Sequence, residues 1–150
     1  MHLQKPVKLL SLLLTLILVL VHCRTTQSKA SLLKEYKAIY IRQFRTVYFQ
    51  KILKEGFNQS AAINEMISSD RSLFTEPILT WEDLRLIDSL VSTDNAKMRG
   101  DSISRIGKIA EGAEGKHVLG FVMDRLRSNY IDSIAKTRYK KSIIKLMYIN

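Results

Sequence analysis

Few side chains in this 150-residue chain could do chemistry. The histidines are His2, His22 and His117, and Cys23 is the single cysteine. A Cys–His or Ser–His–Asp catalytic arrangement would have to use His117, and no nucleophile-elbow motif lies near it in the sequence. Metal sites usually combine several histidine or cysteine ligands, which this composition does not supply. We therefore expect no metal and no cofactor, and we place His117 on a helix surface.

Two carboxylates offer the remaining catalytic interpretation. Glu111 and Glu114 could supply the acid/base pair that glycoside cleavage requires. Gly112 and Gly115 instead favour a mobile loop at this point. The same segment fails the phosphate-loop spacing, because alanine and histidine stand where glycine and Ser/Thr are needed. The sequence therefore predicts a protein that is not an enzyme, with an acid-dependent wall-degrading activity as an alternative.

The first 23 residues have the pattern of a bacterial export signal. Lys5 and Lys8 precede an apolar run, Leu9 to Val21, that is shorter than the ~20 residues of a membrane-crossing helix. Cys23 follows directly, and segment 20–23 resembles a lipobox in which His22 occupies a normally small position. We expect a lipoprotein anchored to a membrane through lipidated Cys23. An ordinary cleaved signal and an uncleaved anchor are the alternatives.

Charge and length describe the part after the signal. Without Lys5 and Lys8, 22 basic residues remain against 14 acidic ones, a formal charge of about +8. Export excludes nucleic acid, so this charge indicates an acidic protein, anionic lipid or cell-wall material. Roughly 127 residues suffice for one domain. We expect a polar tether at 24–30 and a single helical domain at 31–150, with a basic tail at 140–150 and no internal disulfide.

The first half of the domain has helical periodicity. Between Ser31 and Phe57 apolar residues recur every three to five positions, which predicts a long amphipathic helix that ends at Gly56. A second helix is expected from Ser60 to about Ser69. Thr80, followed by two acidic residues, predicts the start of a third helix with its buried stripe at 84–91.

The second half is interpreted as shorter segments. The polar stretch 92–100 predicts an outward loop, and Ser102 is expected to cap a short helix to Ile109. A further helix is expected over 118–126, and Ser128 is expected to cap the last one. No alternating run indicates a sheet. The predicted fold class is all-α, a small bundle of about five or six helices after the export signal.

The C-terminal third resembles a known family. The matching residues are Ala110-Glu111-Gly112, Gly115-Lys116, Val122-Met123-Asp124, Ser128, Ile131-Asp132 and Ala135. Upstream, segment 49–53 is similar to a Phe-x-x-Cys-Leu motif, and Asp70 with Ser72 is similar to an Asp-x-Ser turn. In this order and spacing the motifs resemble those of type VI secretion amidase immunity proteins, over roughly Tyr40 to Tyr139.

The resemblance implies a small helical periplasmic antitoxin, usually a homodimer. Such proteins bind a secreted peptidoglycan amidase, a Cys–His enzyme, and block its catalytic cleft with a protruding loop. The family's two cysteines correspond to Ile52 and Val122 here. If those cysteines pair in relatives, this chain replaces the link by an apolar contact between the same helices.

Two stretches between the third helix and the last pair are candidates for the blocking loops. They are 95–100 and 111–116, since loops project from rigid helices and glycine permits close approach to a cleft. The toxin-facing residues we select are Lys97, Arg99, Glu111, Glu114 and Lys116. Ordinary solvated turns are the alternative for each. For the whole protein, the alternative is a non-enzymatic envelope lipoprotein that acts as a protein-interaction or assembly module.

Overall fold

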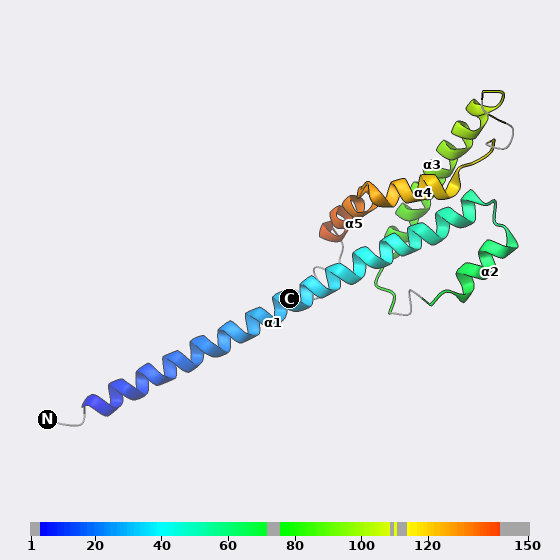
Figure 1. Cartoon of the computed structure of the whole chain (residues 1–150). Coiled ribbons are helices and arrows are strands. Elements are labelled where there is room, and N and C mark those ends of the chain that lie inside the picture. The colour runs from blue at the N-terminus through cyan, green and yellow to red at the C-terminus, as the bar shows by residue number, and fades with distance from the viewer. Residues whose placement is uncertain (1–3, 72–75, 109, 111–113, 142–150) are drawn as a thin grey trace. The chain divides into compact units, whose positions relative to one another are not determined.

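The predicted all-α class is confirmed. The computed structural model describes residues 4–71, 76–108, 110 and 114–141, which contain five helices and no strand (Figure 1). The helices are α1 (Gln4–Gly56), α2 (Ala61–Ser69), α3 (Trp81–Arg105), α4 (Val118–Arg127) and α5 (Tyr130–Lys141).

The chain divides into two units, Met1–Lys37 and Ala38–Asn150. The first unit is the N-terminal part of α1, whose helical backbone starts at Gln4. In the part of the chain that the structure describes, no helix has a stretch long and apolar enough to cross a membrane. The second unit contains the rest of α1, the other four helices and the hydrophobic core.

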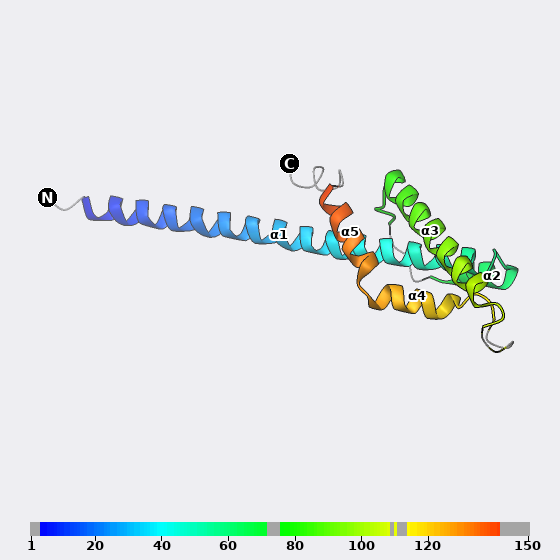
Figure 2. The ribbon, with the colours of Figure 1, turned by 90° about the horizontal axis from the view of Figure 1, so that it is seen from above.

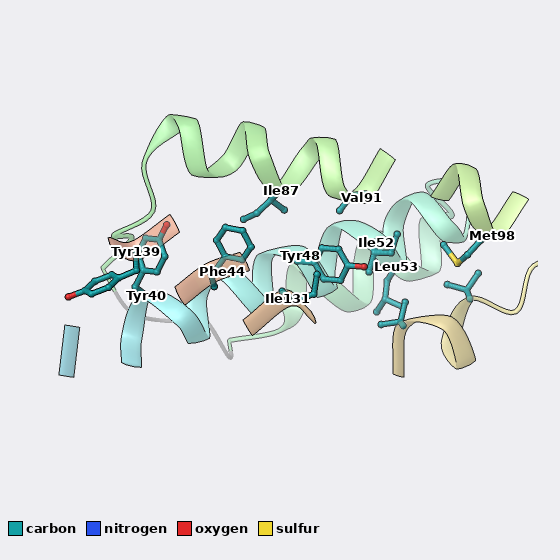
Figure 3. Close-up of a cluster of buried hydrophobic side chains, with 13 residues drawn as sticks. Tyr40, Phe44, Tyr48, Ile52, Leu53, Ile87, Val91, Met98, Ile131 and Tyr139 are labelled. Carbon is teal, nitrogen blue, oxygen red and sulfur yellow. The ribbon is translucent and has the colours of Figure 1, made fainter. Parts of the chain in front are cut away.

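The core is built on one face of α1. Tyr40, Phe44, Tyr48 and Ile52 recur every four residues and are fully buried. They pack in one cluster with α3 residues such as Ile87, and with residues of α4 and α5 (Figure 3). Each buried side chain of this size contributes about 1.5–3 kcal/mol. Within the second unit, α3 and α4 lie on opposite sides of α1, and α5 crosses α1 (Figure 2).

The turn between α1 and α2 begins and ends at the residues that the sequence predicts as helix stop and start signals. α1 ends at Gly56, and Asn58 and Gln59 both have positive φ, which reverses the chain. The Ser60 hydroxyl then accepts a hydrogen bond from the backbone N–H of Ile63 at 3.3 Å and caps α2. Gly56 as the stop and Ser60 as the start are thus both confirmed.

Polar side chains fix the beginning of α3. The buried Gln43 side chain donates to the carbonyl of Glu76 and accepts from the backbone N–H of Ile78, which ties this segment to α1. Thr80 and Asp83 then form a capping box, since each side chain accepts a hydrogen bond from the other's backbone N–H. The predicted cap at Thr80 is confirmed.

The prediction of an outward loop at 92–100 is wrong. α3 continues without a break to Arg105, and its buried side includes Asp94, Asn95 and Met98. Two polar residues, Asp94 and Asn95, occupy buried positions of α3, so the apolar spacing that predicts a helix is interrupted there. Asp94 is buried as a charged residue because Arg125 pairs with it. The predicted cap at Ser102 is also wrong, since this residue lies inside α3. The expected helix to Ile109 ends four residues earlier, and Ile109 lies outside the described residues.

The junction of α4 and α5 differs from the prediction at one residue. Ser128 was expected to cap the start of the last helix, and this is wrong because it lies at the C-cap of α4. Its hydroxyl donates to the carbonyl of Arg125, and its backbone N–H donates to the carbonyl of Asp124. Asn129, with positive φ, turns the chain into α5. The basic tail is described only as far as Lys141.

Candidate partner-binding site

An open cleft of about 480 Å³ lies between α3 and α4. Lys97 and Arg105 stand on its α3 wall, two turns apart, and Phe121 stands on its α4 wall. His117 and Gly115 line the end at which the chain enters α4. The cleft is therefore bounded by two rigid helices and by the connection between them, which carries most of the predicted toxin-facing residues.

Only one of the two predicted cations of α3 reaches this cleft. The Lys97 ammonium lies 6.0 Å from the centre of the Phe121 ring, a cation–π distance. Arg99 is two residues further along the helix, which turns it by about 200° to the opposite side. It is exposed there and does not line the cleft. Because 95–100 is helical, these two side chains do not share a projecting loop.

The connection between α3 and α4 holds the other predicted residues. The Glu114 carboxylate accepts a long hydrogen bond of 3.4 Å from the backbone N–H of Gly107, across the connection. Lys116 donates to the Asn58 side-chain oxygen at 2.7 Å, which ties the connection to the turn after α1. Glu111 lies outside the described residues. Glu114 and Lys116 are thus brought to one connection, and both make contacts within the protein.

His117 is an exposed residue at the N-cap of α4, and its side chain makes no capping hydrogen bond. Its Nδ1 lies 2.9 Å from the Arg105 guanidinium, which connects the end of α3 to the start of α4. A guanidinium only donates, so this contact requires Nδ1 to be the unprotonated nitrogen. His117 is on the helix surface as expected, and it contributes to the cleft through Arg105.

The cleft is held in place by a buried ion pair below it. The Asp94 side chain is 2 % exposed and receives two hydrogen bonds from the Arg125 guanidinium, one of them from Nε at 3.0 Å. The Tyr48 hydroxyl donates to the same carboxylate at 2.6 Å. Arg125 also stacks over the Tyr130 ring, 4.1 Å from its centre. This Tyr48–Asp94–Arg125 cluster joins α1, α3 and α4, and its stack reaches α5.

A second cluster of the same composition lies toward the start of α3. The Asp83 side chain is fully buried, and Arg138 of α5 donates to it at 2.6 Å. The Tyr40 hydroxyl is buried beside it and has no hydrogen-bond partner among the described residues. The Tyr40 ring packs 5.3 Å from that of Tyr139. The Tyr40–Asp83–Arg138 cluster thus joins α1, α3 and α5, as the first joins α1, α3 and α4.

The folded structure shifts the pKa values of Asp83, Tyr40 and Tyr48 in the directions that keep Asp83 ionised and the two phenols neutral. Burial acts to raise the pKa of Asp83, but the hydrogen bonds from Arg138 and from the Thr80 backbone outweigh it and hold the pKa below its ordinary value. Burial, with the neighbouring carboxylates, raises the pKa of Tyr40 and of Tyr48 well above that of an exposed tyrosine. The ionised Asp83 carboxylate and the neutral phenols of Tyr40 and Tyr48 are therefore the stable forms around neutral pH.

These two clusters were not found in the sequence. Polar and charged residue types such as Asp94 and Arg125 are usually exposed, so the sequence gives no reason to bury them. The sequence predicts Asp83 only as an acidic residue in the first turn of a helix. One signal was available: Asp94 continues the stripe of buried positions that includes Val91. A buried charge at such a position requires a partner, but the sequence does not say which arginine provides it.

Ile52 and Val122, the two positions that the resemblance aligns with cysteines, are both buried in the core. Ile52 of α1 is fully buried and Val122 of α4 is 1 % exposed, and both belong to the same hydrophobic cluster. Gly56 lies one turn after Ile52, and a Cβ at this position would come within 2.6 Å of the Val118 side chain. α1 and α4 therefore pack closely here.

Among the described residues, no three histidine, cysteine or acidic side chains are grouped so that they could hold a metal ion. The cleft between α3 and α4 is lined by side chains of both charges around the Phe121 ring. Comparison of the chain with protein-family models, with curated proteins and with solved structures gives no match.

Proposed function

We propose that this protein is an immunity protein that binds a secreted peptidoglycan amidase in the periplasm and sterically blocks its active site. The surface that we assign to this role is the cleft between α3 and α4 together with the connection 106–117. The proposal draws on the predicted export signal and on the resemblance of the C-terminal motifs. One structural observation carries it: a cleft with two cations that form no ion pair among the described residues, Lys97 and Arg105, lies beside helix ends with exposed apolar side chains.

The exposed apolar side chains support a protein partner. Ile106, at the end of α3, is 63 % exposed, and Leu119, in the first turn of α4, is 62 % exposed. Together these two side chains supply apolar area, next to the cleft, that a protein partner would bury. Gly107 and Gly115 both have positive φ, which a side chain would strain, so glycine is favoured at these two positions.

The charges of the cleft support an acidic contact on that partner. Neither Lys97 nor Arg105 forms an ion pair with a described residue, although Asp101 lies between them on the same helix. Such cations at a rim increase the association rate with an acidic surface and contribute to specificity. Because Arg125 and Arg138 clamp α4 and α5 to the bundle, the cleft is preorganised, which reduces the entropy that binding would cost.

Co-expression tests the proposal. A candidate secreted peptidoglycan amidase of the Cys–His class is directed to the periplasm together with the wild-type chain or with the Lys97→Glu/Arg105→Glu variant. The wild-type chain should prevent lysis and co-elute with the amidase in gel filtration, and the variant should bind at least about tenfold more weakly. A variant with the same charge change on α5, Lys136→Glu/Lys140→Glu, is the matched control and should protect like the wild type.

Two results would contradict this proposal. If cells that produce the wild-type chain lyse as readily as cells without it, and no complex survives gel filtration, immunity to that amidase is refuted. If the wild type protects and the α5 control is impaired as strongly as the cleft variant, the site lies elsewhere. An unprotected strain in which the chain co-purifies with envelope-assembly proteins would instead favour the interaction-module alternative.

We further propose that the protein resides in the periplasm and is held at a membrane by lipidated Cys23. The supporting observation is the position of this single cysteine directly after the apolar run. Mass spectrometry of the mature N-terminus distinguishes the alternatives. A diacyl or triacyl adduct on Cys23 supports the anchor, whereas an unmodified N-terminus at another residue, or an intact Met1, contradicts it.

A further inference from the structure

A groove of about 410 Å³ lies between α1 and α3. Lys51, Lys54 and Glu55 line it on α1, and Asp88, Ser92 and Asn95 line it on α3. None of these residues lines the cleft between α3 and α4. The volume falls within the range of about 300–1,000 Å³ that is usual for sites of small molecules. The groove therefore has the size of a ligand site and is separate from the surface that the proposed function uses.

The floor of the groove contains a buried amide with an unsatisfied acceptor. Asn95 is 8 % exposed, and its side-chain oxygen has no hydrogen-bond partner among the described residues. The torsion about the Cβ–Cγ bond of asparagine is soft, so this oxygen can turn toward the groove without a change of the backbone. A buried acceptor that has no partner costs free energy. Asn95 therefore favours a ligand that donates a hydrogen bond.

The charges around the groove are balanced, although the chain as a whole is strongly basic. The full sequence has 24 basic and 14 acidic residues. The groove has two of each, Lys51 and Lys54 against Glu55 and Asp88. A ligand with a single charge would leave one sign in excess, whereas a ligand with one charge of each sign keeps the groove neutral and complements both signs of lining charge. This balance favours a zwitterion over a simple cation or anion.

One group of each sign retains binding capacity. Lys54 forms no ion pair with a described residue, so its ammonium group is available to a carboxylate. Glu55 accepts one hydrogen bond, from the Gln59 side chain at 2.8 Å, and a carboxylate has further lone pairs for a second donor. Lys51 and Asp88, by contrast, are paired with each other. Lys54 and Glu55 are therefore the charged groups that a zwitterion would contact.

We propose that this groove binds a free α-amino acid with a small aliphatic side chain, in its zwitterionic form. The ammonium group of the ligand donates to the Asn95 oxygen and to the Glu55 carboxylate, and the ligand carboxylate accepts from Lys54. Val91, which is 3 % exposed, and the methylene stems of the lysines supply the apolar contact for the ligand side chain. The inference does not rest on the proposed function, because the groove and the amidase-facing cleft have no lining residue in common.

Nuclear magnetic resonance tests the site with L-valine as the probe. The full-length chain is isotope-labelled and titrated in a mild non-ionic detergent. Valine should shift the Ser92 backbone amide and the Asn95 side-chain amide saturably, with the backbone amides of α5 as the reference. Isobutylamine, which lacks the carboxylate, and isovalerate, which lacks the ammonium group, should each bind at least about tenfold more weakly. If valine produces no saturable shift, or if either analogue binds as tightly as valine, the proposal is overturned.

L-Valinamide distinguishes a free amino acid from the N-terminus of a polypeptide. It keeps the ammonium group and the side chain of valine but carries a neutral amide in place of the carboxylate. Binding at least about tenfold weaker than that of valine supports a free zwitterion, because the charge-assisted contact with Lys54 needs a negative charge. Binding as tight as that of valine overturns the proposal, since a polypeptide N-terminus would then fit the groove equally well.

Substitutions assign the two charges of the ligand to their partners. Lys54→Gln should weaken valine binding at least about tenfold and leave isobutylamine binding unchanged, while Lys136→Gln, at an exposed position of α5, should affect neither. Asn95→Leu, which keeps a similar volume without the amide, should weaken the binding of both ligands. Thermal unfolding shows whether this buried variant is folded, and Glu55→Gln, at an exposed position, carries the same expectation if it is not. Unchanged valine binding in Lys54→Gln, in Glu55→Gln or in a folded Asn95→Leu variant overturns the proposal.

Discussion

Removal of the Arg125 guanidinium should lower the free energy of unfolding by more than substitutions of partly exposed residues usually do, because Arg125 pairs with a buried carboxylate. Arg125→Met keeps much of the length and apolar stem of the side chain but leaves the Asp94 carboxylate, 2 % exposed, without its cation. The Tyr48 hydroxyl remains as one donor to that carboxylate. An unpaired buried charge pays its desolvation cost without compensation.

The size of the effect follows from the burial of the pair. Breaking a buried ion pair by removing one partner costs about 3–5 kcal/mol. The Arg125 side chain is 25 % exposed, so some water would reach Asp94 in the variant, and we take the lower end, about 3 kcal/mol. With a urea m-value of about 2 kcal/mol/M for a small domain, the midpoint of unfolding should fall by about 1.5 M.

A triple variant separates the charge effect from the loss of packing. Tyr48→Phe/Asp94→Leu/Arg125→Met removes the whole cluster and leaves no unsatisfied polar group. Because well-packed apolar residues often replace a buried ion pair without loss, this variant should be more stable than Arg125→Met alone. We expect its unfolding free energy to lie within about 2 kcal/mol of the wild type, since three new side chains must also fit the existing space.

Urea unfolding should be followed by far-ultraviolet circular dichroism. The single tryptophan, Trp81, is 72 % exposed in the folded protein, so its fluorescence would change little on unfolding. The reasoning is refuted if Arg125→Met lowers the unfolding free energy by less than about 1 kcal/mol, or if the triple variant is no more stable than the single one. In either case the Asp94–Arg125 pair would not determine how α4 is held.

Three further results are expected. Asp83 has a lowered pKa in the folded state, so its stabilising contribution is present above about pH 4 and is lost as the pH falls further. In acid unfolding, the difference in unfolding free energy between the wild type and Asp83→Asn should therefore decrease below about pH 4. Tyr40 has a raised pKa, so its contribution is lost as pH rises above about 10, and Tyr40→Phe should show a shallower alkaline loss of stability. Gly56→Ala places a Cβ 2.6 Å from Val118 and should cost about 1–3 kcal/mol in thermal unfolding, whereas Gly120→Ala, with open space around it, should stabilise by up to about 1 kcal/mol.

Local signals in the sequence were sufficient for the first three helix boundaries. Gly56 ends α1, Ser60 caps α2, and Thr80 caps α3 because each of these residue types acts on backbone groups within four positions of itself. The apolar period of α1 was readable for the same reason, since Tyr40 and Phe44 lie one turn apart on one helix face.

The same local signals gave wrong predictions where a polar residue is buried or where a capping residue serves the preceding helix. Residues 92–100 have the composition of a loop, but Asp94 and Asn95 lie on the buried side of α3. Ser128 has the type of an N-cap and serves the end of α4 instead. A side chain's type predicts its average environment, and a buried acid departs from that average only because a partner distant in sequence neutralises it.

For the candidate surface, the sequence located a region but not its geometry. It singled out Lys97, Arg99, Glu114 and Lys116 as neighbours in sequence. The helical backbone separates Lys97 and Arg99 by about 200°, so Lys97 lines the cleft and Arg99 is exposed on the other side of α3. The remaining two belong to the connection, where they bind Gly107 and Asn58.

The sequence by itself determined the helical class and the stop and start signals of α1, α2 and α3, because these depend on periodicity and on contacts a few residues apart. Only the tertiary structure decided that Asp83 and Asp94 are buried, that Arg138 and Arg125 neutralise them, and that α3 is one continuous helix with two distinct sides. Those pairings join residues 31 and 55 positions apart, and a partner at that separation is chosen by packing and by the need to compensate a desolvated charge, not by local sequence.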